Sequence, residues 1–158
     1  MLFRSLYPYL EARSGREKQR YDGEVRLVIG CVPIRDKSIL LISSHHSPKE
    51  WVLPKGGWEI DETAEQAAKR ETFEEAGVTG TLGDCISHVT YMNKLGKPVK
   101  WDLYVMSEVK EYDWWPESEM RSRIWVREED IDKVNISSLT KSHIDSILEY
   151  LHTHYYCF

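Results

Sequence analysis

Residues 54–77 read PKGGWEIDETAEQAAKRETFEEAG, and this stretch decides how the chain folds. Thr63 is a favourable N-cap, and Gln66 follows it at the capping-box spacing. The alanines that come next favour helix, and Gly77 stands where a glycine commonly ends one. The pattern predicts a helix that begins near Thr63 and ends before Gly77, entered from a glycine loop at residues 55–57.

Acidic residues are concentrated on this helix and just before it. The whole chain has a net charge of −5, and residues 59–75 alone, with seven acids and two bases, carry the same −5. Glu71 and Glu75 share one helix face, which Glu74 borders, so their carboxylates repel one another. Such a face is either merely solvated or a site for hard cations such as Mg²⁺, which binds carboxylates, water and substrate phosphate oxygens. The adjacent Arg70 and the glycine loop, where backbone can approach a ligand, favour the cation site.

The spacing of these residues resembles the Nudix box: Gly56, then Glu62, then the run RETFEEAGV at residues 70–78. Thr72 departs from the family pattern, where a bulky aliphatic residue is usual, but its methyl group can still pack. The resemblance implies an α/β fold, an α/β/α sandwich with a mixed central sheet, and a divalent cation, Mg²⁺ with Mn²⁺ as the alternative. It assigns metal binding to Glu71, Glu75 and the Gly56 carbonyl, catalysis as base or third ligand to Glu74, and orientation of the glutamates to Arg70.

The remainder of the chain alternates between apolar strands and one further amphipathic helix. The predicted strands are Arg26–Ile34, Ser38–Ser43, Gly80–Tyr91, Val99–Val109 and Ser122–Val126, with a short apolar piece at Trp51–Pro54. The second predicted helix is Ser138–His152. Residues 1–20 are expected to be a peripheral arm with a short helix, and residues 21–158 a single layered domain.

Composition narrows the class of protein further. The 158 residues are 41% apolar and 30% charged, which is typical of a globular chain. No apolar run is long enough for a bilayer, and no secretory signal is visible. The three cysteines fit no zinc or disulfide spacing, so we expect a cytoplasmic location, with the nucleus as an addition. The acidic net charge argues against a stable nucleic-acid partner, and the sequence identifies no protein partner.

Segments that flank the box resemble the diphosphoinositol polyphosphate phosphohydrolases, a Nudix subfamily. They are RLVIGC at 26–31, LISS at 41–44, WVLPKGGW at 51–58, WPE at 115–117 and RSRIW at 121–125. A polyphosphate substrate of this kind needs cations and hydrogen-bond donors around it. The candidates for binding it are Arg26, Ser44, His45, His46, Lys55, Gly57, Lys94, Lys97, Arg121 and Lys141. Each of them could equally be ordinary polar surface.

Three functions remain open at this point. The resemblance implies metal-dependent removal of the β-phosphate from diphosphoinositol polyphosphates, with diadenosine polyphosphates as additional substrates. A dinucleoside polyphosphate or messenger-RNA cap hydrolase is the enzymatic alternative, and would need an aromatic stack for its base. A non-catalytic module that senses polyphosphate is the alternative of another class, but the glutamates of the box are all present.

Overall fold

The computed structural model describes residues 7–9 and 11–155, which form a mixed sheet between two helical layers. Its strands are β1 (Tyr21–Asp22), β2 (Val25–Arg35), β3 (Ser38–Ser43), β4 (Trp51–Val52), β5 (Lys55–Gly57), β6 (Val78–Met92), β7 (Pro98–Glu111) and β8 (Arg123–Arg127). The main path runs β4-β3-β2-β7-β6, while β1 and β5 pair with β2 and β8 pairs with β3.

Strand β2 lies at the centre of this sheet because its sequence is almost continuously apolar. It runs parallel to β7, with Val28 opposite Trp101, and antiparallel to β5, with Ile29 opposite Gly56. Its far end, at Ile34, pairs with β3. A strand buried on both faces reads as an unbroken apolar run, as β2 does.

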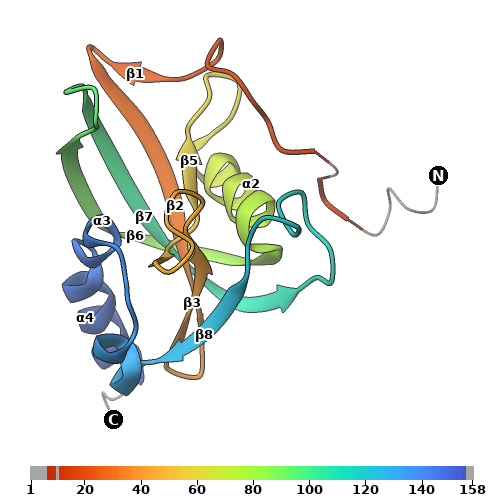
Figure 1. Ribbon diagram of the computed structural model, residues 1–158, viewed down its shortest axis with the longest axis vertical. Helices are drawn as coiled ribbons and strands as arrows, with labels where there is room; N and C mark the ends of the chain where they lie inside the picture. Colours follow the sequence, from red (N-terminus) through yellow and green to blue (C-terminus); the bar gives the residue numbers. More distant parts are fainter. Residues whose placement is uncertain (1–6, 10, 156–158) are drawn as a thin grey trace.

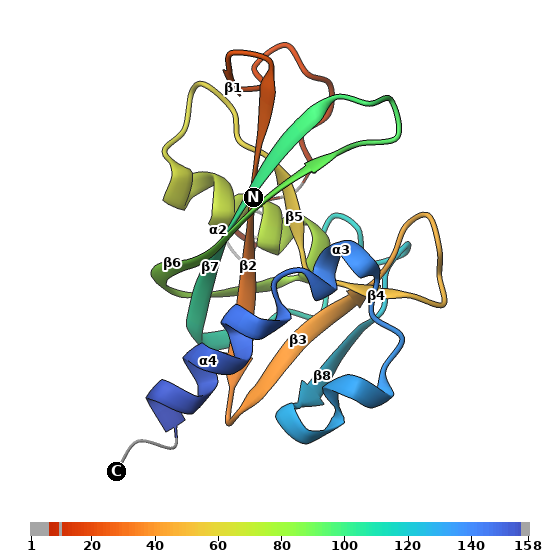
Figure 2. The ribbon, with the colours of Figure 1, turned by 90° about the vertical axis from the view of Figure 1, so that its left-hand side faces the viewer.

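Helices cover both faces of the sheet, which confirms the predicted α/β/α sandwich (Figures 1 and 2). Helix α2 (Ala64–Ala76) lies on one side of the sheet, whereas α4 (Ile144–Tyr155) lies on the other, preceded by the short α3 (Ser138–Lys141). A 3₁₀ helix, η1 (Glu128–Lys133), links β8 to this second layer. The two faces are therefore closed by elements from opposite halves of the chain.

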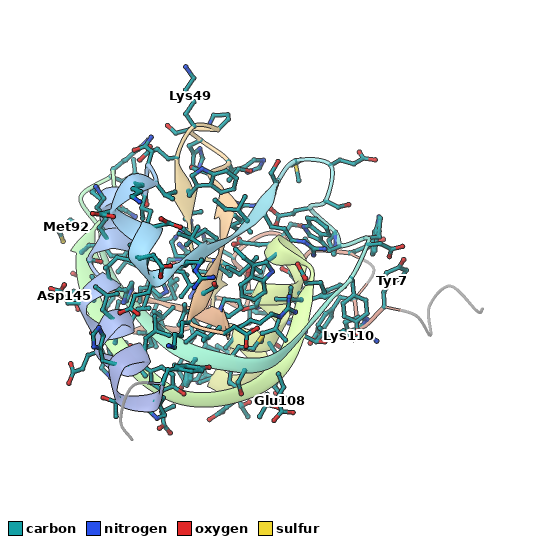
Figure 3. The ribbon with its side chains drawn as sticks, turned by 90° about the horizontal axis from the view of Figure 1, so that it is seen from below. Tyr7, Lys49, Met92, Glu108, Lys110 and Asp145 are labelled. Atoms are coloured by element: carbon teal, nitrogen blue, oxygen red, sulfur yellow. The ribbon has the colours of Figure 1, made fainter. Side chains whose placement is uncertain are left out.

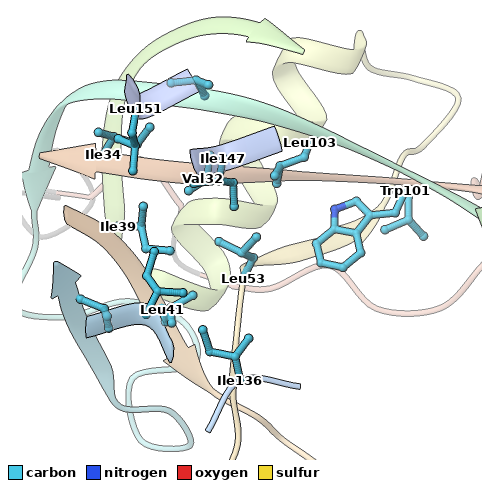
Figure 4. Close-up of a cluster of buried hydrophobic side chains, with 14 of the residues drawn as sticks. Val32, Ile34, Ile39, Leu41, Leu53, Trp101, Leu103, Ile136, Ile147 and Leu151 are labelled. Atoms are coloured by element: carbon cyan, nitrogen blue, oxygen red, sulfur yellow. The ribbon is translucent and has the colours of Figure 1, made fainter. Parts of the chain in front are cut away.

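Each helical layer has its own buried cluster. On the α4 side, side chains of the sheet such as Val32 and Leu103 meet Ile147 and Leu151 of the helix (Figure 4). On the α2 side the cluster is smaller and includes Ile29, Leu40, Ala67, Ala68 and Met106. Small alanines on α2 let the helix approach the sheet closely, and this approach also fixes where its glutamates lie.

Helix α2 ends where the sequence predicts. The Thr63 hydroxyl accepts the Gln66 N–H, and the Gln66 side chain accepts the Thr63 N–H, which completes the capping box. Gly77 adopts φ 69°, and its N–H donates to Phe73 O. Thr72, the departure from the family pattern, is fully buried, and its hydroxyl donates to a carbonyl of its own helix at 2.7 Å. Its polar atom is thus satisfied.

Two of the sequence-based predictions are wrong. The expected loop at residues 55–57 is strand β5, because extended glycines can pair with β2 along its apolar centre. The expected helix Ser138–His152 is broken between α3 and α4. There the Ser142 hydroxyl donates to the Leu139 carbonyl, and side-chain hydroxyls of this kind compete with helical hydrogen bonding. The predicted strands are otherwise present: Ser38–Ser43 is β3 with the predicted bounds, and the ends of the others shift by one or two residues.

The N-terminal arm packs on the domain instead of extending away from it. Its described part holds no helix, and residues 1–6 and 10 lie outside the described residues. The Tyr9 ring lies tilted against that of Phe73 of α2, with centroids 5.9 Å apart, and Gln19 forms a β-bridge with Glu59. No helix in the described ranges combines the length and the apolar character that a bilayer span needs.

Candidate functional site

Strand β5 and helix α2 meet at the glutamates of the helix. A Cβ atom on Gly56 would lie only 2.0 Å from the Glu71 carboxyl carbon, so only glycine leaves room for that side chain. One turn later, the Glu75 carboxylate accepts the backbone N–H of Lys55 at 3.0 Å. The backbone of β5 and two carboxylates of α2 therefore form one wall.

Arg70 holds Glu71 of this wall in place, together with Glu62 and Glu74. Its side chain is 2% exposed and makes a two-nitrogen contact with Glu62, at 2.9 and 2.6 Å. The remaining terminal nitrogen donates to Glu71 at 2.9 Å and to Glu74 at 3.3 Å, while Nη2 also reaches Gly57 O. A buried guanidinium whose three nitrogens all donate to protein oxygens fixes the carboxylates in one arrangement. Arg70 is thus placed to orient the glutamates.

A second arginine supports the other end of the cluster. The Arg121 guanidinium lies 3.6 Å from Glu75 and 2.7 Å from Glu117, and its third nitrogen donates to Ser43 O. Its side chain is buried. Because all three nitrogens contact protein oxygens, Arg121 positions carboxylates and is not free for a substrate phosphate.

These groups line a cavity of about 220 Å³. Its walls are Arg13, Ser14, Gly15, Gln19, Arg26, Gly56, Gly57, Glu59, Glu71, Glu74, Glu75 and Glu117. Five of these residues are acids and two are arginines, so carboxylates dominate the lining, and Arg70, Arg121 and Arg13 offset part of their charge. A cavity of this charge fits cations first, and anionic phosphate only together with them.

The N-terminal arm supplies one side of this cavity. The Arg13 N–H donates to Glu74 at 3.1 Å, and the Arg13 side chain pairs with Glu59 and Asp61. The Ser14 and Gly15 backbone follows along the rim. The arm therefore belongs to the site, although its composition alone suggested only a peripheral segment.

Arg26 gives the cavity a cationic corner. Its Nε donates to the Gln19 side chain at 3.0 Å, and Gln19 in turn donates to three backbone carbonyls. Burial lowers the pKa of Arg26, and the positive charge of Arg16 nearby adds to that shift. A side chain on Gly57 would collide with Gln19 and crowd Arg26. The glycine thus leaves room for the Gln19 side chain that holds the Arg26 guanidinium.

Burial and mutual repulsion disfavour the charged forms of the glutamates of α2. Burial raises the pKa of Glu71, and repulsion from Glu75 and Glu74 raises it further. Burial also raises the pKa of Glu75, although Arg121 opposes this and Glu117 reinforces it. Carboxylates crowded in a buried place are stabilised by divalent cations, whose preferred ligands are such oxygens. The donor set therefore fits Mg²⁺ or Mn²⁺.

The geometry also indicates how the carboxylates would share the cations. Among the described residues, the set of three metal-ligating side chains whose donor atoms all lie within 4.8 Å of one another is elsewhere, on β6 and β7. The glutamates of α2 are more widely spaced than that. Mg²⁺ uses one or two protein carboxylates and fills its shell with water and phosphate oxygens. Each cation would thus depend on the substrate for part of its coordination.

Several predicted substrate contacts do not line this cavity. Lys55 reaches the site through its backbone, while its Nζ lies over the Trp101 ring at 5.4 Å from the centroid. Ser44 accepts a turn hydrogen bond from Ser47, and His45 and His46 are exposed beside it. Lys49 of the same loop points away from the body of the protein (Figure 3). Lys141, the last residue of α3, is also exposed.

Lys94 and Lys97 occupy the exposed turn between β6 and β7. The Asn93 side chain accepts two backbone N–H groups of this turn. At the base of the hairpin, Val99 is the register partner of Arg26. The turn and β1 lie at the same end of the sheet in both ribbon views (Figures 1 and 2). The two lysines therefore extend from the end of the sheet that carries Arg26, but they do not line the cavity.

Four functional neighbours were missed by the sequence reasoning: Arg13, Gln19, Glu59 and Glu117. None belongs to a periodic pattern. Arg13 and Gln19 lie in the arm, Glu59 lies in the loop between β5 and α2, and Glu117 lies in the loop before β8. Glu117 had one usable signal, because it lies four residues before Arg121, a spacing at which side chains of opposite charge often pair. Arg13 and Gln19 are brought in by the path of the arm, and Glu59 by the loop between β5 and α2.

Comparisons with known proteins agree with this geometry. The NUDIX domain family model matches residues 24–147. The chain is 44% identical to "Nudix hydrolase 21, chloroplastic" of Arabidopsis thaliana over 126 residues, covering 74% of this chain and 64% of the relative. It is 35% identical over 102 residues to "Diphosphoinositol polyphosphate phosphohydrolase 3-beta" of Bos taurus, covering 63% of this chain and 61% of that one. The chain thus spans less than two thirds of the length of these relatives.

Solved structures show the same fold. The crystal structure of a MutT NUDIX hydrolase from Burkholderia pseudomallei superposes with a TM-score of 0.66, covering 77% of this chain and 97% of that chain. Sequence identity to it is 21%, so this likeness bears on the fold alone. Because the family model covers most of the chain, the chain belongs to the Nudix family.

Proposed function

We propose that this protein hydrolyses a phosphoanhydride bond with the help of Mg²⁺, for which Mn²⁺ is the alternative. The observation that carries the proposal is the contact between the Gly56 backbone and the buried carboxylate of Glu71, with Glu75 beside it. Glu71 and Glu75 would bind the cations together with the Gly56 carbonyl. A bound divalent cation neutralises phosphate oxygens and lowers the pKa of a bound water.

The remaining side chains of the site would position the carboxylates, accept the proton of the attacking water and bind the substrate. Arg70 keeps Glu71 and Glu74 in place by donating to both. Glu74 lines the cavity and is 2% exposed, and burial raises its pKa, which suits a carboxylate that accepts a proton from the attacking water. Arg26 would bind a phosphate group of the substrate. The guanidinium stays charged throughout the reaction.

The substrate class that fits best is the diphosphoinositol polyphosphates, from which the β-phosphate would be removed. Two arginines line the cavity, Arg13 of the arm and Arg26 of β2, and Arg16 lies near Arg26. None of the described residues that line the cavity is aromatic, so a nucleotide base would find no stacking partner there. The bovine relative is named for this same substrate class. Diadenosine polyphosphates would be accepted as additional substrates through their phosphate chain.

The two alternatives make different demands on the site. A dinucleoside polyphosphate or cap hydrolase needs a base-binding surface in addition to the phosphate site. A polyphosphate-sensing module needs no cation-binding carboxylates, yet here four glutamates from α2 and the loop before β8 line one cavity. The site therefore supports hydrolysis over sensing.

A comparison of hydrolysis rates tests the substrate. Diphosphoinositol pentakisphosphate and diadenosine hexaphosphate are supplied at equal concentration with saturating Mg²⁺, and phosphate release is measured for each. We expect the inositol compound to be cleaved faster. A large excess of the nucleotide rate would overturn the substrate assignment while leaving the hydrolase intact. Absence of turnover on both, with Mg²⁺ and with Mn²⁺, would favour the sensing module.

A further inference from the structure

A second group of metal-ligating side chains lies on the edge strand β6 and its neighbour β7, away from the glutamates of α2. It consists of Cys85, His88 and Asp102, and one donor atom from each lies within 4.8 Å of the others. His88 Nδ1 is 2.6 Å from Asp102 Oδ1, and both His88 ring nitrogens are 3.9 Å from Cys85 Sγ. None of the three lines the catalytic cavity.

An irregularity of the sheet brings these residues together. His88 and Asp102 are direct register partners across the antiparallel pair. Cys85 is three residues from His88, and in a regular strand residues three apart point to opposite faces. The register of β6 against β7 shifts between Cys85 and Ser87, which returns Cys85 to the face that His88 occupies. Such bulges re-aim side chains and recur beside functional sites.

The cluster is accessible from solvent. The His88 side chain is 60% exposed and that of Asp102 is 20% exposed, whereas Cys85 is half-buried. Lys100 lies 3.9 Å from Asp102 as its nearest cationic neighbour. Ser87, between the two β6 ligands, is buried on the other side and meets His143 instead. An ion could therefore reach the three donors without any movement of the backbone.

We propose that Cys85, His88 and Asp102 form a binding site for a zinc-like transition-metal ion, separate from the Mg²⁺ site. A sulfur, a nitrogen and a carboxylate oxygen are the ligands that Zn²⁺ takes, whereas Mg²⁺ and Ca²⁺ select oxygens. Three protein ligands leave a fourth position for water. Binding releases the thiol proton of Cys85 to solvent, and His88 binds the ion through Nδ1 as a neutral ring whose proton is carried on Nε2.

The distances support this assignment. Tetrahedral zinc with ordinary bond lengths separates a thiolate sulfur from an imidazole nitrogen by roughly 3.6 Å, and a nitrogen from a carboxylate oxygen by roughly 3.4 Å. The sulfur–nitrogen distance of 3.9 Å already lies near this value. The nitrogen–oxygen distance of 2.6 Å would have to widen, which a side-chain rotation of the exposed His88 can supply.

Cobalt provides a direct test, because Co²⁺ replaces Zn²⁺ and a thiolate ligand gives it a ligand-to-metal charge-transfer band. The full chain is titrated with Co²⁺ in saturating Mg²⁺, which occupies the carboxylate site. We expect the band to saturate at one equivalent and zinc to abolish it. The Cys85→Ser and His88→Ala variants should lose it, and Asp102→Asn should weaken binding at least 10-fold.

The matched control is Cys157→Ser, which changes a cysteine outside the described residues and should keep the band. Hydrolysis with Mg²⁺ should be unchanged in Cys85→Ser, which also shows that this variant is folded. The proposal is overturned if no charge-transfer band forms, if the band survives Cys85→Ser, or if it appears only with cobalt in large excess over protein.

Discussion

The two helical layers of this protein bury very different side chains. Helix α4 packs on the sheet through an apolar cluster in which Ile147 and Leu151 are fully buried. Helix α2 packs on the opposite face and buries Arg70 and Glu74, each 2% exposed, beside its alanines. Burial of apolar groups stabilises a fold, whereas a buried ion-pair network contributes little net stability. The comparison indicates that the α4 layer supplies stability and the α2 layer holds the chemistry.

The largest expected effect comes from breaking the network of the α2 layer. Arg70→Ala leaves the carboxylates of Glu62, Glu71 and Glu74 without their buried partner. We expect the free energy of unfolding to fall by about 3–5 kcal/mol, because removing one member of a buried pair leaves charge uncompensated. Chemical denaturation measures this. Lys69→Ala, at an exposed position of the same helix, is the control and should change stability by less than about 0.5 kcal/mol.

A substitution in the α4 layer should lower the free energy of unfolding without changing Mg²⁺ binding or hydrolysis. Ile147→Ala opens a cavity between α4 and the sheet, and we expect a loss of about 3 kcal/mol. The Mg²⁺ affinity and the turnover of the folded protein should stay at the wild-type values. A loss of Mg²⁺ affinity in this variant would contradict the division between the two layers.

A methyl group at the contact between β5 and α2 should have the opposite effect to Ile147→Ala and reduce the Mg²⁺ affinity. Gly56→Ala places a Cβ where the Glu71 carboxylate lies, so the carboxylate must move. We expect Mg²⁺ affinity to fall by about 10- to 100-fold, as happens when ligand positions are disturbed. Gly83→Ala is the matched control, because its Cβ would meet only ordinary contacts at 3.6 Å and beyond. Isothermal titration with Mg²⁺ distinguishes the two variants.

The smallest effect is a pH dependence that belongs to the α4 layer. Burial lowers the pKa of His143 to about 4, next to Trp101 and Ser87. Below about pH 6.5 His143 becomes protonated in the unfolded chain but stays neutral in the folded chain. The free energy of unfolding is therefore highest above that pH and falls as the pH drops toward 4. We expect a loss of about 1 kcal/mol between pH 7 and 5.5, measured by denaturation at each pH. His143→Gln should flatten this slope, whereas His46→Gln, at an exposed position, should not.

Much of the fold follows from local patterns in the sequence. The capping box, the alanines and Gly77 predict helix α2 from the sequence, and each of these features is present in the structure. Strands β2 and β3 follow from uninterrupted apolar runs. Lys55–Gly57 could not be recognised as a strand, because its extended form depends on pairing with β2, which is distant in sequence. Local propensity gives no information on such pairing.

The site divides in the same way. Arg70, Glu71, Glu74 and Glu75 come together because helical periodicity alone places them on adjoining faces. Arg13 and Glu117 reach the same cavity along irregular segments, and no periodicity predicts those paths. The basic residues of the loops, such as His45 and Lys94, could be named from the sequence as candidates, but their positions depend on loops that local rules do not fix.

The most direct test of the account is the Glu75→Gln variant, measured for both Mg²⁺ binding and hydrolysis. Glutamine keeps the hydrogen bond from the Lys55 N–H but removes the charge that would hold the cation. We predict a fall in turnover of about 10² or more, with a matching loss of Mg²⁺ affinity and little change in unfolding free energy. Turnover and Mg²⁺ affinity at wild-type values would contradict the claim that the carboxylates of α2 form a catalytic cation site.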